Sequence, residues 1–292
     1  MGNRNDKSSY LQFITAMIII GTIGIFRRSI PVSSAVLAFT RGILGSLSLG
    51  IFVKLRGRRI FNGIERKKLA FLIFNGAVIG VNWIFLFEAY RFTTVAVATL
   101  CYYLQPTLLI LASPIFFKEK LTGRKLILAL TAFAGMILVS GVFGGGGQSG
   151  SMKGVMFGLC AAILYTAAVI GNKKVTGVDP FEKTIIQLAS AAIVVIPYIL
   201  MTEDITEISL SPRTVVLILI VGIIHTGLVY LFYFGSMEHL NAQAVAILSY
   251  IDPVVAVAAS AVFLKEPLTL PVIIGAVLII GSAVLSEKNT GE

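Results

Sequence analysis

The chain has 292 residues, of which 57% are hydrophobic and 13% charged, with a net charge of +10. A soluble domain carries roughly 25% charged residues because its surface faces water, so this composition excludes a soluble fold. The basic residues fall in short segments between apolar runs and form no basic helix face, which excludes nucleic acid as a partner.

Ten apolar runs, bounded by charged residues, glycine or proline, follow one another along the chain. Each approaches the roughly 20 residues that a helix needs to cross hydrocarbon, which predicts a helical bundle rather than a barrel of shorter strands. The predicted fold class is an all-α membrane protein with ten transmembrane helices, and the lipid bilayer is its first partner. The helices are expected near residues 11–27, 32–53, 69–88, 94–117, 124–142, 153–172, 182–200, 213–234, 241–264 and 270–286.

The first run follows Arg4 and Lys7 and also resembles a signal peptide. We interpret it as a retained helix, because the internal symmetry described below needs an odd number of spans in each half. With the amino terminus inside, 17 of the 24 Lys and Arg residues lie in cytoplasmic segments. The positive-inside rule therefore predicts that both termini are cytoplasmic and that 144–150 and 203–207 are external.

A glycine-rich stretch, 144–151, lies between the fifth and sixth predicted helices. It lacks the Lys-Ser/Thr that follows a phosphate-binding loop, so it indicates a flexible linker between halves. The chain is accordingly divided into a first five-helix repeat at 1–143, the linker, and a second five-helix repeat at 152–292.

An internal repeat appears when the sequence is shifted by 147 residues. The shift aligns Gly80 with Gly227, Phe85 with Phe232, Phe87 with Phe234, Tyr103 with Tyr250, Pro106 with Pro253, Lys118-Glu119 with Lys265-Glu266, and Leu121-Thr122 with Leu268-Thr269. Five spans is an odd number, so the second half enters the membrane from the opposite side. Inverted halves of this kind are the architecture of alternating access.

Each half also carries a tyrosine and a proline followed by Lys-Glu-x-Leu-Thr, at 118–122 and 265–269. Together with the segments 89–96 and 237–244, which resemble short turns between the third and fourth helices of each half, this pattern is similar to the EamA-type branch of the drug/metabolite transporter superfamily. The resemblance covers nearly the whole chain. It implies ten helices and transport of a small organic solute, often export of amino acids or related metabolites across a bacterial inner membrane.

Four ionisable residues fall within predicted spans or near their ends: Arg41, Glu88, His225 and Asp252. A charge near the bilayer centre costs roughly 2.5–3.5 kcal/mol, so such residues usually face the bundle interior or a wet cavity. Each is a candidate site residue. Structural alternatives remain open: Arg41 pairing with a carboxylate, Glu88 reaching the membrane interface, and His225 acting as a structural donor rather than a proton relay.

Asp252 immediately precedes Pro253, whose ring removes one helical hydrogen bond, and Pro106 does the same in the first half. Two equivalent helix distortions predict a binding site near the midplane, unless the kinks serve packing alone. The side chains expected there are Tyr102, Tyr103, Gln105, Ser249, Tyr250 and Asp252. Asn82 and Trp83 of the third helix and Tyr165 and Thr166 of the sixth are expected to line the same cavity.

The remaining expectations concern chemistry. With only two histidines and no hydrolase or metalloprotease motif, the sequence predicts neither an enzyme nor a cofactor or metal. An amphoteric small-molecule substrate fits a cavity with Arg41 and an acidic Glu88 or Asp252. Transport of an organic cation or drug is the alternative, and a channel is the next alternative to a transporter.

Cys101, Cys160 and the pairs Gly76/Gly80 and Gly154/Gly158 are interpreted as packing residues. A homodimer is left open. Asp252 is predicted to bind the coupling proton; the alternative interpretation is that it forms a permanent ion pair with Arg41.

Overall fold

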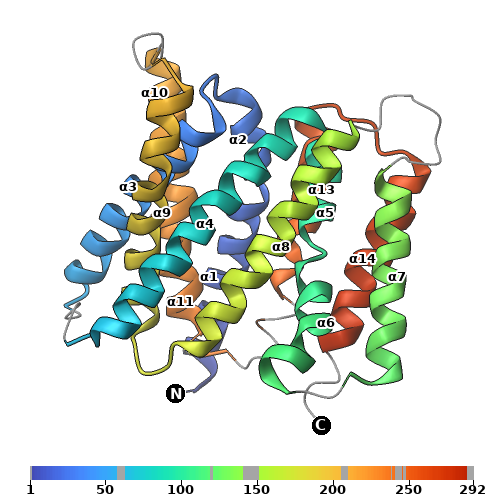
Figure 1. Cartoon of the computed structure of the whole chain (residues 1–292), viewed down its shortest axis with the longest axis horizontal. Coiled ribbons are helices and arrows are strands. Elements are labelled where there is room, and N and C mark those ends of the chain that lie inside the picture. The colour runs from blue at the N-terminus through green and yellow to red at the C-terminus, as the bar shows by residue number, and fades with distance from the viewer. Residues whose placement is uncertain are drawn as a thin grey trace.

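The computed structural model describes residues 2–57, 63–118, 121–140, 151–204, 210–237, 239, 240, 245 and 248–287. Every regular element in these residues is a helix, and the helices pack side by side in one bundle (Figure 1). In this part of the chain seven helices are long and apolar enough to cross a membrane, and two shorter apolar helices accompany them. The chain is therefore an all-helical, multi-pass membrane protein.

The first half of the chain contains seven helical segments. They are α1 (Gly2–Gly21), α2 (Ile23–Ser29), α3 (Ser34–Leu55), α4 (Arg66–Phe92), α5 (Val95–Tyr102), α6 (Gln105–Phe117) and α7 (Gly123–Ser140). Side-chain caps fix where two of them begin: the hydroxyl of Ser33 accepts from the Val36 amide, and that of Thr94 from the Val97 amide. These caps satisfy amides that would otherwise face hydrocarbon or protein without a partner.

The second half is built in the same manner. Its segments are α8 (Met152–Lys174), α9 (Pro180–Thr202), α10 (Pro212–Leu219), a π-helical segment η2 (Ile220–Leu228), α11 (Val229–Met237), α13 (Ile251–Phe263) and α14 (Leu270–Glu287). Ser151, Asp179 and Ser211 cap α8, α9 and α10. Segments α10, η2 and α11 form one continuous apolar span, Pro212–Met237.

Several expected boundaries need correction. The run expected at 11–27 is divided at Thr22, whose hydroxyl donates to the carbonyl of Ile19 at 2.7 Å. Helix α4 continues to Phe92, so residues 89–92 of the expected turn are helical and only Thr93 and Thr94 separate α4 from α5. The segments 144–150 and 205–207, as well as 241–244 within the expected ninth helix, lie outside the described residues.

Glycines bring the long helices together. A Cβ added to Gly76 would lie 2.6 Å from the carbonyl oxygen of Gln187, and one added to Gly80 would lie 2.6 Å from that of Ala191. Helix α4 thus packs directly on the α9 backbone, as its Gly-x-x-x-Gly spacing predicted. Gly154 is equally close to Thr93, at 2.6 Å, which confirms the packing interpretation of that pair.

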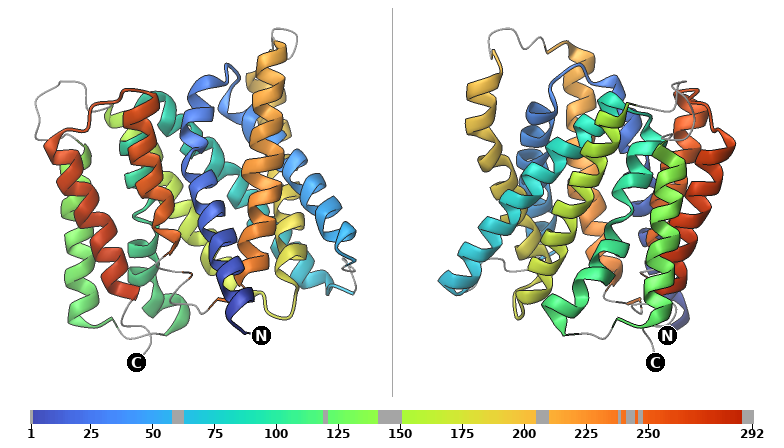
Figure 2. Two further views of the ribbon diagram at one scale, coloured as in Figure 1. Left: turned by 180° about the vertical axis from the view of Figure 1, so that it is seen from behind. Right: turned by 45° about the vertical axis from the view of Figure 1, so that its right-hand side comes forward.

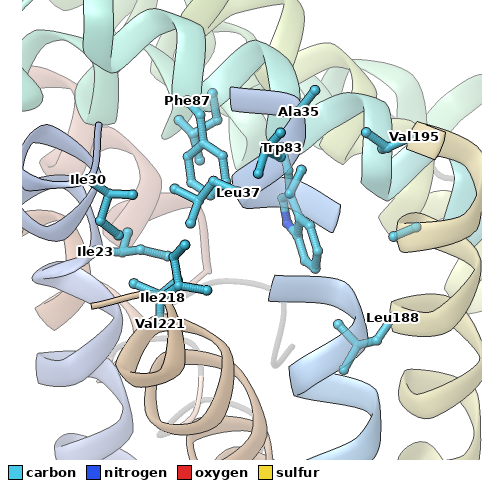
Figure 3. Close-up of a cluster of buried hydrophobic side chains, with 14 of the residues drawn as sticks. Ile23, Ile30, Ala35, Leu37, Trp83, Phe87, Leu188, Val195, Ile218 and Val221 are labelled. Carbon is cyan, nitrogen blue, oxygen red and sulfur yellow. The ribbon is translucent and has the colours of Figure 1, made fainter. Parts of the chain in front are cut away.

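The two halves are interleaved rather than separate. Helix α1 packs against α11 and α13, α3 against α9 and η2, and α4 against α8 and α9, while α7 and α14 lie together at one edge (Figure 2). The main buried cluster includes Leu37, Trp83, Phe87, Ile218 and Val221, from helices of both halves (Figure 3). The core therefore forms where the halves meet.

The bundle has two chemically different ends. The helix ends next to 55–66, 117–123 and 174–180 lie together with the start of α1 and the end of α14 (Figure 1). These segments carry Lys54, Arg56, Arg66, Lys67, Lys68, Lys118, Arg124, Lys125, Lys173 and Lys174. We call this the basic end, and the other the opposite end.

Candidate functional site

The two helix breaks have the same local geometry. Tyr103 follows α5 with φ −74° and ψ 6°, and Tyr250, 147 positions later, precedes α13 with φ −76° and ψ −3°. Pro106 and Pro253 lie in the first turns of the helices that follow. The expected proline kinks are in fact new helix starts, where proline is tolerated because its missing N–H would have no helical partner.

A hydrogen bond joins the two breaks. The Tyr103 hydroxyl donates to Oδ2 of Asp252, so a side chain of the first half contacts one of the second. Beside it, the rings of Tyr102 and Tyr165 stack with centroids 5.2 Å apart, and Tyr102 meets Tyr103 edge-on at 6.2 Å. Asp252, Tyr102 and Tyr103 are half-buried and Tyr165 is more exposed. Three tyrosines and one carboxylate are thus available to a ligand at the breaks.

Helix α8 supports this arrangement from one side. The hydroxyl of Thr166 donates to the Ala162 carbonyl at 2.8 Å and lies 3.4 Å from the carbonyl oxygen of Gln105. The side chain of Gln105 is half-buried, whereas Tyr250 is only 6% exposed. Gln105 is therefore held near the cluster through its backbone, while Tyr250 packs inside the protein.

Arg41 occupies a buried position on α3. Its Nε donates to the Thr226 hydroxyl at 2.9 Å, and its guanidinium lies over the Trp83 ring at 4.3 Å from the centroid. Such cation–π contact stabilises a partly desolvated cation. Within the described residues no carboxylate lies within 4.0 Å of Arg41, so the ion pair with Asp252 that the sequence left open is not present.

His225 lies on the π-helical segment and is 3% exposed. Its Nε2 is 3.0 Å from the Thr22 hydroxyl, and its Nδ1 is 3.4 Å from the carbonyl oxygen of Ile220. The ring also meets Phe26 edge-on at 4.5 Å. These contacts are those of a structural donor that holds α1 and α2 against η2.

Two other candidate residues are held by protein groups of their own. Asn82 is 1% exposed and its Nδ2 donates to the Ala161 carbonyl at 2.6 Å, which ties α4 to α8. Glu88 forms an ion pair of 2.9 Å with Arg91 on its own helix, near the opposite end. Neither residue takes part in the Tyr103–Asp252 hydrogen bond that joins the breaks.

Sequence reasoning missed three tyrosines near this site. Tyr230 lies near Arg41 and Tyr102, and Tyr233 lies near Tyr165. Tyr90 interacts with both Arg41 and Asp252. The repeat held a signal for one of them, because Tyr230 is the counterpart of Trp83 at the 147-residue offset. The site is thus rich in aromatic rings and hydroxyls around one cation and one anion.

A second contact between the halves lies at the opposite end. Oε2 of Glu266 accepts from the Val95 amide at 2.9 Å, at the start of α5, while Arg28 approaches Oε1 at 3.4 Å and donates to the Thr93 carbonyl at 2.6 Å. Burial raises the pKa of Glu266, although Arg28 and the backbone N–H groups act in the other direction. The carboxylate therefore closes this end of the bundle against α5.

Known proteins agree with this architecture. A transporter of Bacillus subtilis, "Uncharacterized transporter YxxF", is 27% identical over 264 residues, which cover 90% of this chain and 84% of that protein. A "Probable amino-acid metabolite efflux pump" of Salmonella typhimurium is 30% identical over 174 residues, 56% of this chain and 57% of that protein. A solved crystal structure with 18% identity covers 95% of this chain and 97% of its own with a TM-score of 0.67, so the fold is shared.

The apolar spans and these relatives define the class as a multi-pass membrane transporter. The model of the EamA-like transporter family matches the chain twice, at residues 7–141 and 152–287. The protein belongs to the EamA-like transporter family. Among the described residues no group of three His, Cys, Asp or Glu side chains is arranged to hold a metal ion.

Proposed function

We propose that this protein is a secondary active transporter that exports small amphoteric metabolites, such as amino acids, by alternating access. The observation that carries the proposal is the Tyr103–Asp252 hydrogen bond between two equivalent helix breaks. A contact of this kind changes whenever one half moves against the other. Broken helices near the middle of a bundle are the usual location of substrate and coupling-ion sites in transporters.

The architecture in this proposal is ten membrane helices in two inverted halves of five. Two successive matches to one family model support it. Equal local geometry at the 147-residue offset supports it further: Lys118 and Lys265 have φ of 58° and 53° and, in the described residues, are the non-glycine residues with positive φ. In an inverted pair, swapping the conformations of the halves moves the opening from one side to the other.

The proposed orientation places the basic end in the cytoplasm of the cell and both termini on that side of its inner (plasma) membrane. The clustering of lysine and arginine at one end of the bundle supports it. The test is labelling of single cysteines in a variant without Cys101 and Cys160. Position 148 should react only from outside, and reaction only from the cytoplasmic side would overturn the inverted assignment.

The choice of an amphoteric substrate rests on charge. Arg41 and Asp252 interact electrostatically but form no ion pair within the described residues, so each retains attraction for an opposite charge on a solute. The tyrosine hydroxyls around them add hydrogen bonds at little conformational cost. The efflux pump of Salmonella typhimurium, named for amino-acid metabolites, is consistent with this class.

A second candidate, export of an organic cation or drug, is favoured by the contacts of Arg41. Its Nε is occupied by Thr226 and its face by Trp83, which leaves Asp252 as the half-buried charge at the breaks. Aromatic rings beside a carboxylate suit a cation. Arg41→Gln separates the two candidates: it should weaken binding of an amino acid strongly but leave binding of a cation nearly unchanged.

The experiment begins with a thermal-shift screen of the purified protein against a metabolite library, because a bound solute stabilises the folded state by mass action. The solutes that raise Tm are then tested for counterflow in liposomes. A transporter accumulates labelled solute transiently when unlabelled solute is loaded on the other side. Simple equilibration without this overshoot would instead indicate a channel.

A further inference from the structure

A cavity of about 610 Å³ opens at the opposite end of the bundle, apart from the helix breaks. It is bounded by the connection between α2 and α3 and by the ends of α4 and α9. Its lining residues are Arg27, Arg28, Ile30, Pro31, Val32, Ser33, Tyr90, Arg91 and Glu203. Three guanidinium groups lie in this lining, and two of them, Arg28 and Arg91, are paired with Glu266 and Glu88.

Arg27 is the unusual member of this lining. It is 4% exposed; Nη1 donates to the Ile30 carbonyl at 3.0 Å and Nη2 to the Ser34 hydroxyl at 3.1 Å, while Nε has no hydrogen-bond partner in the described residues. Both of its hydrogen bonds go to neutral groups. Its positive charge is therefore not neutralised by the contacts that hold it.

The charged groups around Arg27 do not compensate for this. Its electrostatic neighbours are Arg91, Glu88 and Arg28. Glu88 is paired with Arg91, and Arg28 with Glu266. Within the described residues no carboxylate lies within 4.0 Å of Arg27 itself. A buried cation without a counter-charge is costly, and such groups normally pair with an anion.

Tyr90 connects this cavity to the central site. It lines the cavity, is 3% exposed, and lies near Asp252 and Arg41 of the helix breaks. Its hydroxyl is 3.3 Å from that of Thr99 in α5.

We infer that this cavity is a second solute site, in which Arg27 binds the carboxylate of the transported metabolite at the opposite end of the pathway. The assignment of the ligand as the transported solute rests on the proposed function; the existence of an anion site does not. Guanidinium groups recognise carboxylates through short, charge-assisted hydrogen bonds. Arg28 and Arg91 are already paired with Glu266 and Glu88, which leaves Arg27 as the group that attracts the anion, while Glu203 in the same lining repels it.

The test measures protection of a cysteine placed in the cavity. Pro31→Cys, at an exposed lining position, is introduced into a variant lacking Cys101 and Cys160, and the protein is placed in phosphatidylcholine nanodiscs with both faces accessible. Succinate should slow maleimide labelling about threefold at twice its Kd, because the free fraction then falls to about a third. Succinamide, its neutral isostere, should not slow labelling.

Charge variants define the site. Arg27→Gln should abolish protection by succinate, and Arg27→Lys should retain part of it. Glu203→Gln should strengthen protection, because it removes a negative charge that repels the succinate carboxylates. Arg213→Gln, at the same end but outside the cavity, is the matched control and should leave protection unchanged. If Arg27→Gln does not fold, Glu203→Gln decides: unchanged protection in that variant overturns the proposal, as does equal protection by succinamide.

Two further outcomes separate this inference from its alternatives. If phosphatidylglycerol in the nanodiscs slows labelling without succinate, the cavity binds a lipid headgroup and the solute assignment is wrong. Labelling needs no transport, so protection without any counterflow would contradict the proposed function while supporting the anion site. Counterflow without protection would support the proposed function and contradict the anion site.

Discussion

Tyr103 is the residue whose hydroxyl joins the two halves at the candidate site. Tyr103→Phe keeps the ring but leaves Asp252 without this donor. A hydrogen bond between neutral groups contributes about 0.5–1.5 kcal/mol, and one to an ionised carboxylate about 1.5–3 kcal/mol, so the free energy of unfolding should fall by at least about 0.5 kcal/mol, and by more where Asp252 is ionised. The measurement is a denaturant titration of the purified protein.

Tyr165→Phe is the matched control for this variant. The substitution keeps the ring that stacks on Tyr102 and removes only the hydroxyl. We therefore expect the free energy of unfolding to change by about 0.5 kcal/mol or less. Equal losses in both variants would show that the Tyr103 hydroxyl contributes nothing specific.

At the residue scale, sequence reasoning identified the charged and aromatic residues of the breaks because charge inside a span is rare. It could not assign their partners. Arg41 was expected to contact a carboxylate or the substrate, yet Thr226 and Trp83 hold it. Such pairing depends on the rotation of helices far apart in the chain, which a single sequence does not contain.

At the scale of helices, the contact between α4 and α9 depends on the absence of a side chain at Gly80. In Gly80→Ala the new Cβ would lie 2.6 Å from the Ala191 carbonyl oxygen, so the helices must separate. Overpacking of this kind costs about 1–3 kcal/mol. Thermal melts of the purified protein should show a lower Tm.

Gly50→Ala serves as the control, because a Cβ at Gly50 in α3 meets nothing within 4 Å. Alanine is the better helix former, so stability should stay constant or rise by up to about 1 kcal/mol. A Tm for Gly80→Ala equal to that of Gly50→Ala would contradict the proposed close packing of α4 on α9.

Glu266 predicts a pH dependence at the start of α5. Burial raises the pKa of its carboxyl above the ordinary 4.5, so the native state binds this proton more tightly than the unfolded chain. Its contribution is complete below pH 4.5 and is lost as the pH rises through the raised value. The Tm of the wild type minus that of Glu266→Gln should therefore decrease as pH increases from 4.5.

Glu88→Gln is the comparison for this series, since its carboxylate at the same end is paired within α4. A Glu266 difference that stays constant with pH, or grows as pH rises, would show that the hydrogen bonds from Val95 and Arg28 dominate over burial. Following the same difference in high salt would test the Arg28 contribution, because exposed charge interactions are screened.

Most helices could be predicted from the sequence because each apolar run must satisfy its backbone internally in lipid. The breaks at Tyr103 and Tyr250 also followed from their prolines. The π-helical segment did not, because Ile220–Leu228 is uniformly apolar apart from His225 and Thr226. Its wider turn is stabilised by contacts such as the 3.0 Å bond from the Thr226 hydroxyl to the Val221 carbonyl, five residues back.

At the scale of the whole molecule, the interleaving of the halves explains why local changes at the breaks would reach both ends. Helix α1 packs on α11 and α13, and Glu266 of the second half contacts the start of α5 in the first. In the proposed transport cycle, movement of one half would break and remake contacts at the breaks and at the opposite end together. This coupling is what alternating access requires.

We propose that Asp252 couples a proton to solute movement between the two equivalent helix breaks. Its carboxyl accepts a hydrogen bond from the Tyr103 hydroxyl and, within the described residues, forms no ion pair with Arg41. The most direct test is solute uptake by Asp252→Asn in liposomes, with and without an imposed pH gradient. If Asp252 binds the coupling proton, the variant loses gradient-driven accumulation but retains counterflow exchange. Unaltered pH-driven accumulation in the variant would contradict it and eliminate Asp252 as the proton site.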